Sequence, residues 1–264
     1  MPVGQWGRGY SDLALLIEDA LNDGVDVITT SSSYPSDYEG MRWALARAIA
    51  SKVPVVASTG NDSTRNSTEW LPSWGGVVGV GAIETNGRPS DYQNWGRPLS
   101  TAALARPLAR SGVSQERGEW WGTSFASPVV AGSLALSMQR WPSATGNQIL
   151  QGLARTGVGG NGGEWNEYTG YGALDIYAML TTNPTSFPDE NPFLDKGTHT
   201  VPSRQDVQDY IDGVVDPRVV MNDNSYEYLG YDERLALSRE HGYPTHLGTS
   251  PRFHASNMSN AKKK

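Results

Sequence analysis

The chain has 264 residues, enough for one large domain or two small ones, and 28 Asp and Glu against 21 Lys and Arg give a formal net charge of −7. This acidic balance argues against nucleic acid as a partner, and the absence of cysteine excludes disulfides and thiolate metal sites. No apolar run reaches the roughly 18 residues of a membrane span, and the opening MPVGQWGRGYSD shows no signal peptide.

Helix and strand patterns alternate over the first part of the chain. An amphipathic helix follows Ser11 or Asp12, either of which can cap it, and Gly24 ends it. Pro54 stops a second helix. Helices are predicted over residues 11–23 and 38–52, and buried strands over residues 25–30, 53–59 and 75–83. Strand, helix and strand at this spacing predict an α/β fold with a doubly wound parallel sheet.

The middle of the chain carries weaker strand signals. Residues 99–119 are predicted to be loop-like, and a helix is predicted over residues 124–139. Another helix is predicted to start at Pro142 and Ser143. A glycine-rich loop then leads to a short strand and a helix over residues 171–180.

The composition changes after Thr182, where Pro and Asn become frequent. We therefore expect one domain over residues 1–182 and a mostly irregular extension over residues 183–264. Two short helices are predicted in that extension, near residues 203–212 and 232–241, and the last twenty residues are predicted to be a flexible tail.

Ser124 stands at the start of a predicted helix, in the segment GTSFASPVVAG. A helix N-terminus favours developing negative charge, and a serine hydroxyl becomes a nucleophile when a base takes its proton. Gly122 and Ala126 keep the approach to Ser124 uncrowded, and Pro128 is expected in the first turn, where a missing N–H costs nothing. Serine is also a common helix cap, so position alone does not separate the two roles.

Five segments, taken in order, resemble the subtilisin-like serine proteases, the subtilase family. The five are DVITTSSS (26–33), VPVVASTGND (53–62), LPSWGGVVGVGAIETNGRPSDYQNWG (71–96), GTSFASPVVAG (122–132) and GYGALDIYAML (170–180). The resemblance covers about residues 10–182. It implies a subtilisin-type sheet, truncated at its N-terminal side in this chain, and a serine endopeptidase that cleaves peptides or proteins without a cofactor.

The resemblance also implies roles for individual residues. Ser124 would be the nucleophile that forms an acyl-enzyme, and its N–H and the Asn61 amide would hold the oxyanion. An extended peptide would pair with strand edges on both sides of the site. The implied substrate-binding residues are Ser31, Ser32 and Ser33 on one wall, Ser58, Thr59 and Gly60 on the other, and Gly122 and Thr123 before the nucleophile. The family segments that bind calcium are absent, so we expect no metal.

The acid and the base of the family's triad have no counterpart here. The Asp-Ser-Gly or Asp-Thr-Gly segment and the His-Gly-Thr segment are missing, and all four histidines follow Ser124: His199, His241, His246 and His254. Three explanations stay open. A separate or upstream subtilase fragment supplies Asp and His and covers the strand edge left open; the chain is an inactive, peptide-binding scaffold; or a histidine of the tail reaches Ser124.

Several other features have simpler interpretations. Asp26 and Asp175 are expected to be structural, at a strand start and in the closing family segment. Asn61, Asn66 and Asn257 begin triplets of the glycosylation type, which arise often by chance. The segment LSTAALARPLARSG stands where the family has Ala-Pro-Gly. Most members of the family are exported, which favours a secreted protein, although the chain shows no export signal.

Overall fold

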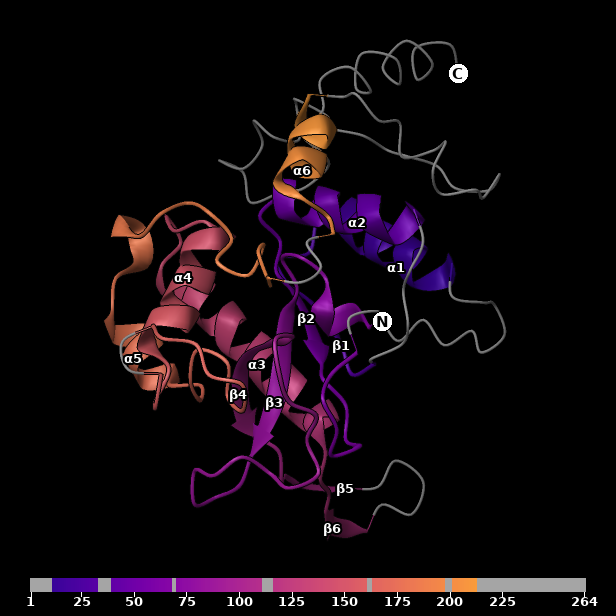
Figure 1. Ribbon diagram of the computed structural model, residues 1–264. Coiled ribbons are helices and arrows are strands. Elements are labelled where there is room, and N and C mark those ends of the chain that lie inside the picture. The colour runs from indigo at the N-terminus through magenta and orange to yellow at the C-terminus, as the bar shows by residue number, and fades with distance from the viewer. Residues whose placement is uncertain are drawn as a thin grey trace. The chain divides into compact units, whose positions relative to one another are not determined.

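The computed structural model describes residues 11–32, 39–67, 70–110, 116–160, 163–197 and 201–212, and it contains two compact units (Figure 1). One unit holds the helices α1 (Ser11–Asn22), α2 (Glu39–Ala50) and α6 (Arg204–Ile211). The other unit holds the described residues of 27–32 and 54–201, with all the strands of the described part. Every predicted site residue that the structure describes belongs to this second unit.

The second unit is built on a parallel sheet of four strands that lie side by side in chain order. The strands are β1 (Ile28–Thr30), β2 (Val55–Ser58), β3 (Val78–Ile83) and β4 (Leu99–Leu104). Ile28 is paired with Val55, and Val56 is paired with Val78. Because the carboxyl ends of parallel strands meet at one edge of a sheet, the residues that follow β1 and β2 are brought together. The expected α/β fold with a parallel sheet is confirmed.

Helix α3 (Thr123–Arg140) packs against all four strands, and α4 (Gly146–Thr156) and α5 (Ile176–Thr181) pack against α3. Ala126, Val130 and Leu134 are spaced four residues apart, so they share the face of α3 that is buried. Apolar side chains from these elements form the core. Its fully buried members include Val56, Val78, Val80, Ala82, Ala105, Ala126, Val130, Leu134, Ile149 and Leu150.

The prediction that residues 99–119 are loop-like is wrong. The described part of this range contains β4 and an antiparallel pair, β5 (Leu108–Arg110) and β6 (Arg117–Glu119). The strand β4 has small side chains because a glycine-rich segment lies directly against it. Thr101 Oγ1 donates to Gly172 O at 2.9 Å, and a Cβ on Gly170 would lie 2.5 Å from a backbone carbon of Ser100. A search for apolar runs does not detect such a strand.

The prediction of a strand directly before α5 is also wrong. Ala173 forms only isolated bridges, with Ala102 and Val158. The helix that follows is confirmed, and Asp175 caps it by accepting a hydrogen bond from Ala178 N–H at 2.9 Å. Asp175 therefore has the structural role expected of it.

Helix α4 begins at Gly146, several residues after the predicted start at Pro142. Thr145 is its cap, since Thr145 Oγ1 accepts a hydrogen bond from Gln148 N–H at 3.2 Å. Gln148 Oε1 in turn accepts from Thr145 N–H at 3.0 Å, which completes a capping box. Thr145 Oγ1 also donates to Asp189 Oδ1 at 2.6 Å, so the same hydroxyl holds part of the extension.

The first part of the extension belongs to the unit that contains the sheet. It includes a 3₁₀ turn, η2 (Pro184–Ser186). Phe193 is buried in the core, and its carbonyl accepts a hydrogen bond from Gly76 N–H at 2.9 Å. Asn191 Nδ2 donates to Gly76 O at 3.0 Å. This first part of the extension is thus hydrogen-bonded to the sheet unit, and the domain boundary at residue 182 stays a prediction.

Lys196 ties the extension to a 3₁₀ turn and to the start of β4. Its side chain is buried, and Nζ donates to Pro72 O at 2.6 Å, to Pro98 O at 2.9 Å and to Ser100 Oγ at 3.3 Å. Pro72 lies in the 3₁₀ turn η1 (Leu71–Ser73), and Pro98 directly precedes β4. Burial lowers the pKa of Lys196 to about 7.

In the other unit, α1 and α2 pack together around a buried ion pair. Arg47 Nη1 of α2 contacts Glu18 Oε2 of α1, and both side chains are fully buried. Burying one of these charges without its partner costs much free energy, so removing either side chain alone destabilises the folded state.

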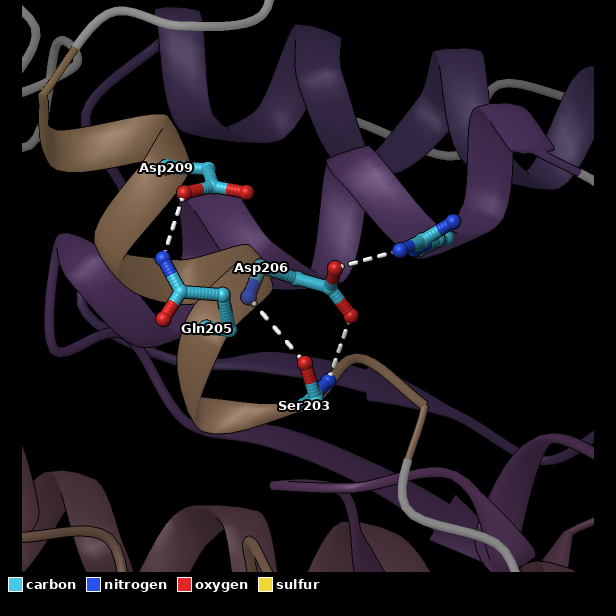
Figure 2. Close-up of polar contacts among 5 residues, drawn as sticks. Ser203, Gln205, Asp206 and Asp209 are labelled. Atoms are coloured by element: carbon cyan, nitrogen blue, oxygen red, sulfur yellow. Dashed lines mark hydrogen bonds and ion pairs between the residues drawn. The ribbon is translucent and has the colours of Figure 1, made fainter.

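Helix α6 packs against α2, and a capping box fixes its start. Ser203 Oγ accepts a hydrogen bond from Asp206 N–H at 3.1 Å, and Asp206 Oδ2 accepts from Ser203 N–H at 2.6 Å (Figure 2). Arg42 of α2 forms an ion pair with Asp206. Burial opposes ionisation of Asp206, but the hydrogen bonds from Arg42 and Ser203 outweigh burial and lower its pKa. The helix predicted near residues 203–212 is confirmed.

Two predictions for the C-terminal extension, the helix near residues 232–241 and the flexible tail, lie outside the described residues. Across the described ranges, the structure contains no helix of the length and apolarity needed to cross a membrane.

Candidate active site

Asn61 meets the start of α3 near the carboxyl end of β2. Its side-chain Oδ1 accepts two hydrogen bonds from Thr123, one from N–H at 2.8 Å and one from Oγ1 at 3.1 Å. The same Thr123 Oγ1 accepts from Gly60 N–H at 3.1 Å. Thr123 directly precedes Ser124, so the structure brings Asn61 next to the predicted nucleophile.

The bonds to Oδ1 also determine which way the Asn61 amide is turned. With Oδ1 held by Thr123, Nδ2 faces Gly122, where an added Cβ would lie 3.2 Å from it. Gly122 has a φ of 131°, a conformation that residues with a side chain rarely adopt. Gly122 therefore leaves space beside an exposed side-chain N–H donor.

Ser124 is the second residue of α3 and is half-buried. Its N–H has no partner within the helix, because the helix begins only one residue earlier. Its Oγ donates to Ser31 O at 3.3 Å. A side-chain amide N–H and a free N–H at a helix start are the kinds of donor that can stabilise developing negative charge.

The prediction that Pro128 lies in the first turn of α3 is wrong, because the helix begins at Thr123 and Pro128 falls in its second turn. The ring nitrogen of Pro128 stands where an N–H would otherwise donate to the carbonyl of Ser124, four residues earlier. Ser31 Oγ supplies the missing donor and bonds to Ser124 O at 2.8 Å. This contact joins the residue after β1 to the first turn of α3.

A second contact of the same kind lies one turn further along α3. Ser127 Oγ donates to Thr30 O at 3.2 Å and lies 3.2 Å from Thr29 Oγ1. The hydroxyl-rich end of β1 is therefore used to fix the beginning of α3 against the sheet.

The two predicted walls of the substrate site differ in how exposed their side chains are. Ser58 and Thr59 are buried, and Thr59 Oγ1 donates to Val80 O at 3.1 Å, so their side chains face the interior. Gly60 is buried as well. On the other wall Ser31 is exposed and Ser32 is half-buried, whereas Ser33 lies outside the described residues.

No base accompanies Ser124 among the residues that the structure describes. All four histidines fall outside those residues, and so does the suggested contact of a tail histidine with Ser124. The acceptor of the Ser124 hydroxyl is a backbone carbonyl, which does not take up a proton. In the described part of the chain, no three His, Cys, Asp or Glu side chains gather as metal ligands would.

Sequence reasoning missed four residues next to the site. Tyr92 Oη accepts a hydrogen bond from Gly122 N–H at 3.3 Å, and its ring centroid lies 4.8 Å from that of Trp121. Trp120 and Trp121 are exposed aromatic side chains directly before Gly122. Asn94 is buried and bonds to the loop that carries Asn61. The exposed Trp pair beside the GTS motif was the one visible signal.

The other described residues singled out from the sequence lie away from the contact between Asn61 and the start of α3. Asp26 is exposed two residues before β1. Asn66, in the second glycosylation-type triplet, is buried and its Nδ2 donates to Trp95 O at 3.2 Å, which leaves no room for a glycan. Asn257, in the third triplet, lies outside the described residues.

Comparison with known proteins identifies the family to which this site belongs. The model of the subtilase family matches residues 4–172, which is more than half of the chain. The chain belongs to the subtilase family. This subtilase is 30% identical over 172 residues to subtilisin DY from Bacillus licheniformis, and 27% identical over 173 residues to subtilisin E from Bacillus subtilis (strain 168).

Solved structures carry the same fold. This subtilase aligns with the crystal structure of MycP1 lacking its N-terminal propeptide, at 25% identity and a TM-score of 0.58, over 69% of each chain. It aligns with fervidolysin from Fervidobacterium pennivorans, a keratinolytic enzyme related to subtilisin, at 24% identity and a TM-score of 0.58, over 67% of this chain and 30% of that one.

The matches cover only part of the relatives. The alignments take in 64% of this chain, 62% of subtilisin DY and 44% of subtilisin E. The subtilase lineage is one of serine proteases.

Proposed function

We propose that this chain carries the nucleophile and the oxyanion site of a serine endopeptidase. The observation that supports this most is the pair of hydrogen bonds from Thr123 to Asn61 Oδ1, at 2.8 and 3.1 Å. They hold the Asn61 amide against the residue that precedes Ser124, with Nδ2 beside Gly122. An ordinary helix cap at Ser124 needs no such amide beside it.

In this proposal Ser124 Oγ attacks the carbonyl carbon of a peptide bond and gives up its proton to a base. The carbonyl oxygen becomes negative in the tetrahedral intermediate and accepts hydrogen bonds from Asn61 Nδ2 and Ser124 N–H. The protonated base then gives its proton to the leaving nitrogen, so that breakdown of the intermediate releases the amine and leaves an acyl group on Ser124. Water then hydrolyses this ester and regenerates the hydroxyl.

The base and its orienting acid come from outside the described residues in this proposal. We favour a complementary subtilase segment, on a separate polypeptide or elsewhere in the same protein, that carries both groups. The short strand β1 pairs only with β2 within the described part of the sheet, which leaves a strand edge suited to such a segment. A histidine of the extension, or an inactive peptide-binding scaffold, are the competing outcomes.

The substrate in this proposal is an extended polypeptide. The side chains of Ser58 and Thr59 are buried, and the backbone groups of Thr59 and Gly60 are already hydrogen-bonded within the unit, so this wall would offer the substrate a surface rather than hydrogen-bonding partners. Ser31 and Ser32 would serve on the opposite wall. The exposed ring of Trp121, packed on Tyr92, offers an apolar surface beside the nucleophile for a substrate side chain.

A fluorophosphonate probe tests the assignment of the nucleophile. The proposal predicts one covalent adduct, which peptide mapping places on Ser124 and which Ser124→Ala abolishes. The exposed Ser143 gives a matched control, and Ser143→Ala should leave labelling unchanged. Labelling that rises when a histidine-bearing subtilase segment is added supports the complement, and the absence of any Ser124 adduct with or without it supports the inactive scaffold.

A further inference from the structure

Asn94 is a buried amide whose hydrogen-bonding groups all point at one short loop. It lies in the segment between β3 and β4, and its side chain is 1% exposed. Its Oδ1 accepts hydrogen bonds from Asp62 N–H at 2.8 Å and from Thr64 N–H at 3.3 Å. Its Nδ2 donates to Thr59 O at 3.1 Å and to Asp62 Oδ2 at 3.1 Å. The four contacts use both acceptor and both donor positions of the amide.

The loop is shaped to let Asn94 approach. Gly60 has a φ of 101°, and a Cβ on Gly60 would lie 2.5 Å from Asn94 Nδ2 and 3.2 Å from Trp70. A side chain at position 60 would therefore separate Asn94 from Thr59. Asn94 N–H also donates to Gly60 O at 3.0 Å, so backbone and side chain both hold the loop.

Asn61 lies between the residues that Asn94 holds on either side. The side chain of Asn61 is exposed and makes its hydrogen bonds to Thr123. Water can replace the partners of an exposed amide, so the bonds to Thr123 hold Asn61 only weakly by themselves. They orient the Asn61 amide as long as the backbone from Thr59 to Thr64 keeps Asn61 within reach of Thr123.

We propose that Asn94 is a positioning residue, which holds the loop of residues 59–64 so that the Asn61 amide stays turned toward the carbonyl group that Ser124 attacks. This inference rests on the proposed function of Ser124 and Asn61. Asn94 touches neither the substrate nor the reacting atoms, and it acts through the backbone of Asp62 and Thr64.

Amide hydrogen exchange, followed by NMR on the full chain, tests the positioning independently of activity. In Asn94→Ala we expect the amides of Asp62 and Thr64 to exchange faster, since they lose their acceptor. The amide of Thr123 should also exchange at least about tenfold faster, because its acceptor on Asn61 is no longer held in place. The amide of Gly79, held by Ser100 Oγ at 3.1 Å, should stay unchanged.

A matched control lies in the same connecting segment. Asn86 is exposed, and its Oδ1 accepts from Arg88 N–H at 3.0 Å. Asn86→Ala should leave the exchange of Thr123 unchanged. Faster exchange at Asp62 and Thr64 with no change at Thr123 would overturn the proposal, and so would equal acceleration at Gly79, since Asn94 would then support the fold as a whole.

The rate of fluorophosphonate labelling supplies the second measurement. We expect Asn94→Ala to label Ser124 at least about tenfold more slowly than the parent chain, by losing an oriented oxyanion donor. Unchanged labelling despite faster exchange at Thr123 would contradict a role in the reaction. If the parent chain forms no adduct on Ser124, with or without an added histidine-bearing subtilase segment, the proposed function fails, while the exchange at Thr123 still decides whether Asn94 positions Asn61.

Discussion

Lys196 provides a test of how the extension is fastened to the sheet. Lys196→Met keeps much of the length of the side chain but removes its charge and its three hydrogen bonds. The carbonyls of Pro72 and Pro98 would be left buried without these donors, at a cost of about 1–3 kcal/mol each. At alkaline pH, where the lysine is neutral in both states, we therefore expect the variant to be less stable by about 2–6 kcal/mol.

The pH dependence of this difference follows from the pKa of Lys196, which burial lowers from 10.5 to about 7. Below pH 7 the amine is charged in the native and unfolded states, and its contribution does not change with pH. Between pH 7 and 10.5 the unfolded state binds a proton that the native state does not. Native stability then rises with pH by up to about 1.4 kcal/mol per unit. The advantage of the parent chain over Lys196→Met should widen by about 2–3 kcal/mol between pH 7.5 and 9.5.

Guanidinium unfolding followed by tryptophan fluorescence at pH 7.5, 8.5 and 9.5 measures this change. Lys196→Arg is the matched control, because its guanidinium stays protonated throughout and should remove the pH-dependent part. Stability curves of the parent chain and Lys196→Met that run parallel over this range would refute the buried, neutral lysine.

Three other predictions concern single contacts. Gly122→Ala should slow labelling of Ser124 by about tenfold or more, because the added Cβ would crowd Asn61 Nδ2 and alanine rarely adopts the φ of this position. Labelling at the parent rate would contradict this role of Gly122. Thr145→Ala should lower the free energy of unfolding by about 1 kcal/mol while Thr145→Ser keeps it, and calorimetry that finds both variants equal would count against the cap. Arg47→Met should lower the free energy of unfolding by about 3–5 kcal/mol in chemical denaturation, because the charge of Glu18 stays buried without its partner. Adding Glu18→Leu to this variant should recover most of the loss, and additive losses would argue against the buried pair.

The sequence indicated the place of the candidate site where a recognisable motif contains residues suited to catalysis. The GTSFASP segment and the strand that ends before Asn61 led to the two residues that the structure brings together at the start of α3. Buried aliphatic runs predicted β2 and β3. These signals are local, and each can be recognised without knowing the partner segment.

Other features depend on contacts between distant segments. The strand β4 escaped prediction because residues such as Ala102 and Ala103 are small, and their burial follows from the segment packed against them. The pairing of Ser31 with Ser124 requires knowledge of where α3 begins, because only then is Pro128 seen to free a carbonyl. Asn94 has no motif of its own, and its bonds reach residues about thirty positions earlier in the chain.

The rate at which Ser124 reacts with a fluorophosphonate, compared between the parent chain and Asn61→Leu, tests the central claim most directly. An oxyanion site retains part of its effect without a base, so the chain alone is suited to the measurement. Our account predicts that Asn61→Leu slows the reaction by about tenfold or more, whereas Asn86→Leu leaves it unchanged. Equal rates for the parent chain and Asn61→Leu would show that the Asn61 amide and the Ser124 hydroxyl do not act on the same group.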